Sequence, residues 1–205
     1  MTITAETREL ISEKIEFRES SNGVRTITGY AVKWNMKSHP MQEDGIKFTE
    51  QFSKGAFSES LTKDDQRALW SHDMSKILGR TKNGSLRLKE DNIGLRFELD
   101  LPNTTVGQDV YESVKRGDID GVSFGFSMEA EEWDDKNKGG IVRTITKAKL
   151  FEISPVTFPA YPDSEVSARN ENPFKRYLEE RKQKDLRKRL LLKIKLRNIQ
   201  RGKFD

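Results

Sequence analysis

Cysteine is absent from this sequence of 205 residues, and histidine occurs only twice. The absence of cysteine excludes a disulfide framework, a thiolate nucleophile and a cysteine-based zinc site. Because His39 and His72 are the only histidines, a zinc site with several histidine ligands is not expected either. We therefore expect no metal and no cofactor, and a histidine-dependent mechanism has only two candidate residues.

Long apolar runs are also missing. No stretch approaches the roughly 18 consecutive apolar residues that a membrane-spanning helix needs. The N-terminal MTITAETREL lacks the basic-then-apolar pattern of a signal peptide. A glycine-rich phosphate loop, a His-Glu-x-x-His zinc motif and a Gly-x-Ser-x-Gly elbow are absent as well. We expect a protein that stays out of membranes, in a reducing cytoplasm.

Charge is distributed unevenly along the chain. Residues 174–205 contain 13 basic and 4 acidic side chains, for a net charge of +9, whereas residues 1–173 contain 24 basic and 29 acidic side chains, for −5. Asn172-Pro173 is a helix-start signal, and no helix breaker follows until Gly202. We predict a body over residues 1–165, followed over 166–205 by a linker and a basic helical tail.

The body has the pattern of many short strands with few helices. Alternating apolar and polar residues around Ser21-Asn22-Gly23 predict a hairpin over 13–34. Further strands are predicted at 67–72, 77–81, 85–90, 94–101, 122–133 and 141–154. Short helices are predicted at 52–61 and from a Thr104 or Thr105 cap to Gly117, and the proline-rich segment 154–163 is predicted to be a fixed loop.

This order of elements predicts a mainly β, α+β fold. We expect a closed or nearly closed antiparallel β-barrel with flanking helices, and consider an open α+β sheet the alternative.

Ser123 is the candidate nucleophile. In a strand, Val122, Phe124 and Phe126 face one side, while Ser123 and Gly125 face the other. The apolar side would anchor the strand in the core, and the small side would leave room for a substrate carbonyl above the hydroxyl. The same alternation also fits a strand whose small-residue face packs against a helix.

His72 is the candidate base, because a serine hydroxyl needs a group that removes its proton. It ends an apolar strand, whereas His39 precedes a proline in a polar loop. Asp73 and Glu152 are candidates for orienting the imidazole. Adjacent strand residues point to opposite faces, which disfavours Asp73. Glu152 is an acid between apolar neighbours and needs a partner, which favours it.

Eight short segments, in this order over about residues 15–165, resemble the prohead protease family of tailed bacteriophages. They are Gly29-Tyr30-Ala31-Val32 with Trp34-Asn35, Gly55-Ala56-Phe57, Ser71-His72-Asp73, Leu78-Gly79-Arg80-Thr81, Leu101-Pro102-Asn103-Thr104, Arg116-Gly117-Asp118, Ser123-Phe124-Gly125-Phe126, and residues 150–157 with Pro159-Ala160-Tyr161-Pro162. Two positions depart from the family pattern: Ser71 replaces the usual asparagine, and Lys54 the usual proline.

The resemblance implies a barrel like that of the herpesvirus assembly proteases and a serine protease mechanism. It places the nucleophile at Ser123, the base at His72 and a third member at Glu152. It also implies action inside the assembling procapsid in the host cytoplasm (or the bacterial cytoplasm for a prophage), cleavage of scaffold or of the scaffolding segment of the major capsid protein, and self-cleavage. The herpesvirus analogy adds a homodimer. Oxyanion stabilisation is expected from backbone N–H groups near Ser123 or from Arg80.

The basic tail is open to three interpretations. It fits a segment that docks on acidic scaffold or capsid surfaces and is later removed, a solvated charged helix, or a weak nucleic-acid contact. Few aromatic residues are interleaved, so nucleic acid is the least supported. The alternative function is a non-catalytic capsid assembly or scaffold protein with this tail as its docking segment.

Overall fold

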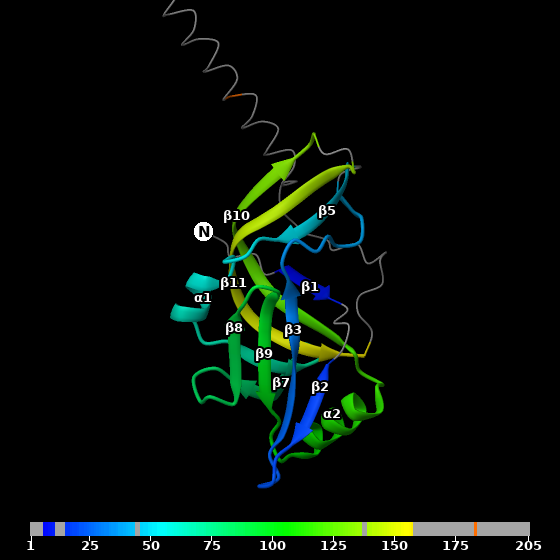
Figure 1. The fold of residues 1–205 in the computed structure, drawn as a ribbon, viewed down its shortest axis with the longest axis vertical. Coiled ribbons are helices and arrows are strands. Elements are labelled where there is room, and N and C mark those ends of the chain that lie inside the picture. Colours follow the sequence, from blue (N-terminus) through cyan, green and yellow to red (C-terminus); the bar gives the residue numbers. More distant parts are fainter. Residues whose placement is uncertain (1–5, 11–14, 44–45, 137–138, 158–182, 184–205) are drawn as a thin grey trace, which may run out of the picture. The chain divides into compact units, whose positions relative to one another are not determined.

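A computed structural model describes residues 6–10, 15–43, 46–136, 139–157 and 183 (Figure 1). The chain divides into two compact units, of which the first comprises residues 1–42 and 46–166. The architecture below is that of the first unit. The predicted basic helical tail lies outside the described residues, apart from the exposed helical position 183.

Eleven strands and two helices make up the described part of the chain, so the prediction of a mainly β fold with few helices is confirmed. The strands are β1 (Glu6–Leu10), β2 (Glu16–Glu19), β3 (Arg25–Lys33), β4 (Met41–Glu43), β5 (Ile46–Phe52), β6 (Arg67–Trp70), β7 (Asp73–Arg80), β8 (Leu86–Glu90), β9 (Gly94–Asp100), β10 (Gly121–Asp134) and β11 (Ile141–Val156). The helices are α1 (Ser58–Lys63) and α2 (Thr105–Arg116).

The strands form two sheets rather than the predicted closed antiparallel barrel, and that prediction is wrong for the described residues. One sheet has the order β2-β3-β9-β8, and its strands lie side by side in Figure 1. The other has the order β1-β10-β11-β5-β4, with β6 paired to β11 and β7 paired to β6. β11 pairs antiparallel with β10 but parallel with β5 and with β6. The parallel pairs depend on long-range register, which local alternation does not encode.

A cluster of phenylalanine rings forms the centre of the core. Phe52, Phe57, Phe124 and Phe126 lie with neighbouring ring centroids 5.2–5.6 Å apart in stacked, tilted and edge-on pairs. Val122, Phe124 and Phe126 are fully buried, as expected of the apolar side of β10. This packing holds β10, and therefore Ser123, rigidly in place.

Local signals predicted several elements well. The Thr104 hydroxyl accepts a hydrogen bond from the Gly107 N–H (3.2 Å) and caps α2, which ends at Gly117 with a left-handed φ of 80°. The hairpin β2–β3 turns at Gly23, whose φ is 79°. The helix predicted at 52–61 is α1, which begins only at Ser58 because the preceding residues belong to β5 and a turn.

The proline-rich loop predicted from residue 154 is wrong at its start, because β11 continues to Val156. Pro155 is the Cα partner of Val122, and its carbonyl accepts a hydrogen bond from the Ser71 N–H (3.3 Å). Residues 158–163 lie outside the described residues.

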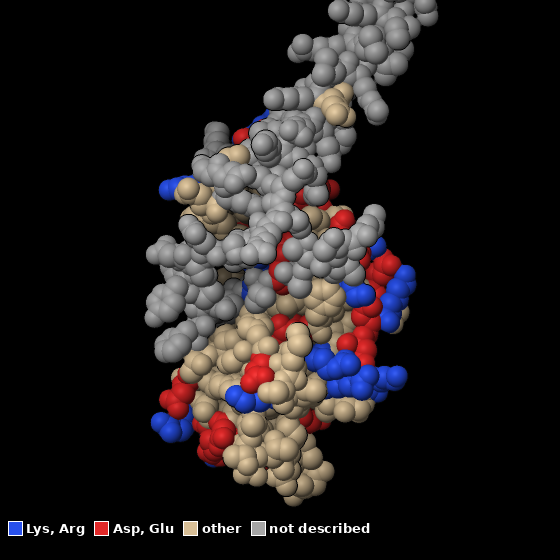
Figure 2. All heavy atoms as spheres, turned by 180° about the vertical axis from the view of Figure 1, so that it is seen from behind, with Lys and Arg blue, Asp and Glu red and all other residues tan. Residues whose placement is uncertain are grey.

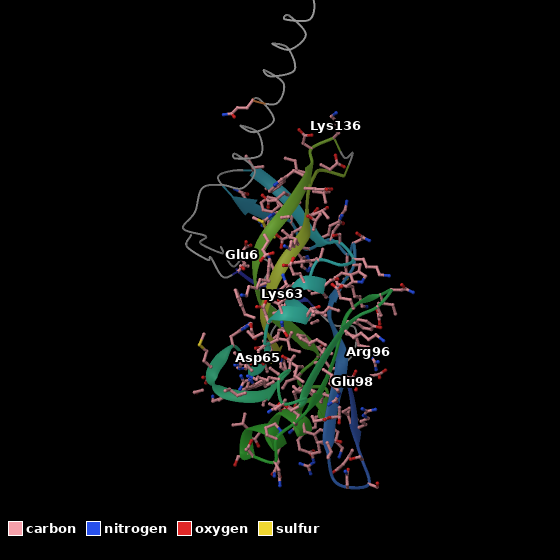
Figure 3. The ribbon with its side chains drawn as sticks, turned by 90° about the vertical axis from the view of Figure 1, so that its left-hand side faces the viewer. Glu6, Lys63, Asp65, Arg96, Glu98 and Lys136 are labelled. Atoms are coloured by element: carbon pink, nitrogen blue, oxygen red, sulfur yellow. The ribbon has the colours of Figure 1, made fainter. Side chains whose placement is uncertain are left out.

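Acidic and basic side chains are interspersed on the molecular face in Figure 2. Arg96 and Glu98, two residues apart on β9, form an ion pair of 3.4 Å on the same side of the four-stranded sheet (Figure 3). Among the described residues, no helix is long and apolar enough to cross a membrane.

Candidate active site

Ser123 lies near the start of β10, between two neighbouring strands. Its Cα partners are Ser154 on β11 and Glu9 on β1. The residue is fully buried, and its hydroxyl donates a hydrogen bond of 3.0 Å to the Arg8 carbonyl oxygen. The hydroxyl therefore lies against the backbone of an extended segment, as a nucleophile must lie against a peptide substrate.

His72 lies in a tight turn between β6 and β7. Ser71 and His72 both have left-handed backbone conformations, with φ of 49° and 61°. Such a conformation costs a non-glycine residue on the order of 1 kcal/mol or more. Two hydrogen bonds to β11 hold the turn: the Ser71 N–H donates to Pro155, and the His72 N–H donates to Ser154 Oγ (3.1 Å).

Glu152 contacts the imidazole directly. Its Oε1 lies 2.8 Å from His72 Nδ1, and its Oε2 accepts a hydrogen bond of 2.6 Å from Ser154 Oγ. In the tautomer with its hydrogen on Nδ1, the neutral imidazole donates this hydrogen bond to the carboxylate and has its lone pair on Nε2. This is the tautomer in which Nε2 can take a proton from a hydroxyl.

Pairing between strands brings these groups together from distant parts of the chain. Parallel pairing of β6 with β11 places Glu152 beside Arg67, at the strand that leads to His72. Antiparallel pairing of β10 with β11 places Ser154 opposite Ser123 and Glu152 opposite Gly125. Ser154 therefore joins the serine strand to the histidine turn.

Gly125 leaves the space that the carboxylate occupies. A Cβ atom built at this position would lie 2.7 Å from Glu152 Oε1, closer than such atoms approach. The glycine of the Ser-Phe-Gly-Phe segment thus has a specific role: it lets the acid lie over β10 and reach the imidazole.

The remaining candidates lie elsewhere. The Asp73 carboxylate accepts a hydrogen bond from the Ser75 N–H (2.9 Å) and pairs with Lys76 (3.3 Å). Hydrogen bonds from Ser75 and Lys76 hold its pKa below the usual value. His39 is in an exposed loop. Arg80, proposed for the oxyanion, donates to Asp65 (2.7 Å) and forms an ion pair with it.

Ser154 was missed by sequence reasoning. It stands two residues after Glu152, so the period of a strand places both on one face of β11. The strand predicted at 141–154 already contained both residues, so this spacing could have identified Ser154 as a neighbour of the acid.

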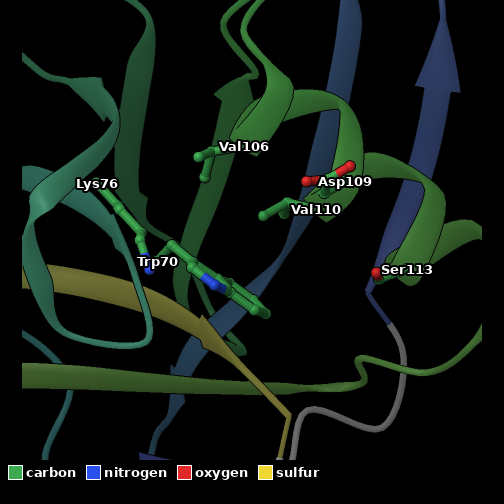
Figure 4. A pocket seen from close by; sticks show the side chains of 6 residues that line it. All are labelled: Trp70, Lys76, Val106, Asp109, Val110 and Ser113. Carbon is green, nitrogen blue, oxygen red and sulfur yellow. The ribbon is translucent and has the colours of Figure 1, made fainter.

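A surface hollow of about 160 Å³ lies between α2 and the β6–β7 region (Figure 4). Its lining residues are Trp70, Lys76, Val106, Asp109, Val110 and Ser113. None of these is Ser123, His72 or Glu152, although Trp70 immediately precedes the histidine turn. This hollow is therefore distinct from the group of Ser123, His72 and Glu152, which hydrogen bonds and strand register define.

Comparisons with known proteins identify a family for the chain. A family model described as caudovirus prohead serine protease matches residues 13–180. None of the curated proteins matches the chain. A solved structure, that of the capsid assembly protease gp21 of bacteriophage T4, is similar over 75% of this chain and 99% of its own, with 12% sequence identity and a TM-score of 0.42.

Proposed function

Because this chain belongs to the caudovirus prohead serine protease family, we propose that it is an endopeptidase with Ser123 as nucleophile, His72 as general base and Glu152 as the residue that orients the imidazole. The observation that carries the proposal is the 2.8 Å contact between His72 Nδ1 and Glu152 Oε1, made beside the strand that bears Ser123.

The mechanism uses the tautomer of His72 that has its hydrogen on Nδ1, beside Glu152. The Ser123 hydroxyl turns from the Arg8 carbonyl toward His72 Nε2, which takes its proton as Oγ bonds to the substrate carbonyl carbon. The imidazolium gives that proton to the leaving nitrogen, which breaks the peptide bond and leaves an acyl-enzyme. Water then attacks the acyl-enzyme carbonyl carbon, with His72 again taking and returning a proton. This step frees Ser123 and releases the carboxyl end of the cleaved peptide. Glu152 stabilises the imidazolium throughout.

The substrates that we propose are scaffold and the scaffolding segment of the major capsid protein, together with the protease chain itself. Cleavage inside a procapsid would remove the material that occupies its interior. We further propose docking of the +9 tail on acidic scaffold or capsid surfaces, for which the support is its charge alone.

Co-expression with the neighbouring capsid gene product, followed by mass spectrometry of fragments, tests the proposal. Ser123→Ala and His72→Ala should each lower the cleavage rate by about a millionfold, on the scale of other triads. Ser127→Ala, in the same strand, and His39→Ala should cleave like the unaltered chain. Cleavage by the Ser123→Ala chain would show that the nucleophile is another residue. No cleavage by any chain would favour a non-catalytic assembly protein.

A further inference from the structure

β1 lies against the strand that carries Ser123. Residues 6–10 pair antiparallel with residues 122–126 of β10, in a register that places Glu9 opposite Ser123. The match to the family model begins at residue 13, so β1 precedes the part of the chain that the family shares. An extended peptide that adds a strand to a sheet edge is a common mode of peptide recognition, with main-chain hydrogen bonds for affinity and side-chain pockets for specificity.

The backbone of β1 also meets the nucleophile as a substrate would. The Arg8 carbonyl oxygen is the acceptor of the Ser123 hydroxyl hydrogen bond (3.0 Å). The peptide bond between Arg8 and Glu9 is therefore the one presented to Ser123.

The Arg8 side chain fills a buried acidic site. Its Nε donates to Glu50 Oε1 (2.5 Å), and its Nη2 lies 3.2 Å from Glu50 Oε2 and 2.6 Å from Glu6 Oε2. The guanidinium carbon lies 5.6 Å from the centre of the Phe126 ring. A planar cation held by both oxygens of one carboxylate and placed on an aromatic ring is the geometry that favours arginine over lysine.

Leaving out β1 would remove both the Arg8 guanidinium and the Glu6 carboxylate, so the net charge of the group would not change. What would change is the surroundings of Glu50, which is only 2% exposed and contacts two guanidiniums, those of Arg8 (2.5 Å) and Arg143 (2.7 Å). Without β1, this buried carboxylate keeps the Arg143 contact and loses the Arg8 contact, and a buried carboxylate is stabilised by a paired cation. Glu6, which arrives on the same strand, lies nearer the surface at 17% exposure.

We infer that β1 occupies the place of a substrate strand, and that Glu50 is a specificity-determining residue that binds an arginine side chain immediately before the cleaved bond. This inference rests on the proposed function. In such a substrate, Ser123 Oγ bonds to the arginine carbonyl carbon, the bond to the following nitrogen breaks, and that nitrogen receives the serine proton through His72.

The test uses the full chain and synthetic 12-residue peptides with the sequence of residues 3–14, in which the residue corresponding to Arg8 is Arg, Lys, Gln or Glu. The arginine peptide should be cut after its arginine. Replacement by glutamine should lower kcat/KM on the order of 100-fold, because the buried carboxylate of Glu50 loses one of the two guanidiniums that contact it, and replacement by glutamate should lower it further. Lysine should lie between arginine and glutamine.

A variant of the chain itself separates substrate mimicry from a structural role. Arg8→Gln should loosen β1 and raise the rate on the arginine peptide severalfold, while Arg18→Gln, at an exposed arginine of β2, should leave the rate unchanged. A purely structural Arg8 would instead give a slower or less stable variant. Glu50→Gln should bring the arginine-to-glutamine ratio toward one, and the peptide series remains decisive if that variant does not fold.

The two proposals fail differently. If the chain cleaves capsid or scaffold protein but cuts the arginine and glutamine peptides at equal rates, the specificity inference is wrong and the proposed function stands. If no chain cleaves any peptide or protein, both are wrong.

Discussion

β10 and β11 carry two polar clusters near opposite ends of their pairing, and the two are built on different principles. The first, here called the serine cluster, contains Ser123, His72, Glu152 and Ser154. Hydrogen bonds join Ser154, Glu152 and His72, whose side chain is 32% exposed, and strand pairing places Ser123 opposite Ser154. The second, the arginine cluster, consists of ion pairs among Glu50, Glu131, Arg143 and Arg8.

The difference lies in burial and in the capacity to take up a proton. Burial raises the pKa of Glu50, but the guanidiniums of Arg8 and Arg143 more than offset this and hold the pKa below its usual value. The arginine cluster therefore keeps fixed charges near neutral pH, which suits stability or recognition. The serine cluster contains an imidazole, the side chain that most often transfers protons in catalysis, and so suits chemistry.

Glu152→Gln breaks the serine cluster while keeping its shape. Glutamine can direct its amide N–H₂ at Nδ1, which disfavours the tautomer needed for proton transfer, so kcat/KM should fall on the order of 10³- to 10⁴-fold. The fold should remain, with a thermal midpoint close to that of the unaltered chain. Glu132→Gln, at an exposed position of β10, serves as the control, and equal activity of the two variants would contradict the role of Glu152.

Arg143→Met breaks the arginine cluster. It removes the guanidinium that the buried Glu50 shares with the partly buried Glu131, so the free energy of unfolding should fall by about 3–5 kcal/mol. Urea denaturation measures this, with Arg116→Met at the exposed end of α2 as a control that should change it by less than about 0.5 kcal/mol. A variant as stable as that control would show that the cluster contributes little to the fold.

Gly125→Ala sharpens the comparison by moving the acid without removing it. The new methyl group would displace the Glu152 carboxylate from His72, and a displacement of about 1 Å can cost about 100-fold in rate. Steady-state kinetics should show this loss in the single variant and no additional loss when the substitution is combined with Glu152→Gln. Additive losses would mean that Gly125 acts through something other than Glu152.

Asp65→Asn supplies an exposed ion pair for comparison. The hydrogen bond from Arg80 holds the pKa of Asp65 well below its ordinary value of 3.8. A lowered folded-state pKa stabilises the fold above the ordinary value, and this contribution is lost as the pH falls toward the lower one. The urea midpoints of the two chains should therefore differ at pH 6 and converge as the pH falls below 3.8. Asp120→Asn, at an exposed position, should show no such convergence, and a difference that grows in acid would contradict the assignment.

Local chemistry made much of the body predictable from its sequence. Glycine at a left-handed turn, threonine at a helix start and alternation along β10 act within a few residues, so α2, the β2–β3 hairpin and the buried face of Val122 are as predicted. Asp73 was disfavoured by the period of a strand, and Glu152 was favoured as an acid between apolar neighbours. The structure places Glu152 Oε1 2.8 Å from His72 Nδ1, with His72 in a turn and not in a strand.

The features that were missed depend on distant partners. β1 has Leu10 as its one apolar residue, and β5 has the acid Glu50 on its otherwise apolar buried face, so neither was predicted; both pair with the long strands β10 and β11. The ion pair between Arg8 and Glu50 joins residues 42 positions apart, and no local pattern predicts it. The closed or nearly closed barrel was predicted from the many short strands with few helices and from the family resemblance, neither of which determines how the strands pair.

The position of β11 in the chain has a consequence for the timing of activity. This last described strand supplies Glu152 and Ser154 and also holds the histidine turn. A chain still emerging from the ribosome has His72 and Ser123 before it has the strand that contacts the histidine turn. On the proposed mechanism, the order of synthesis therefore puts the completion of the site at the end of the body, after β11 has been made.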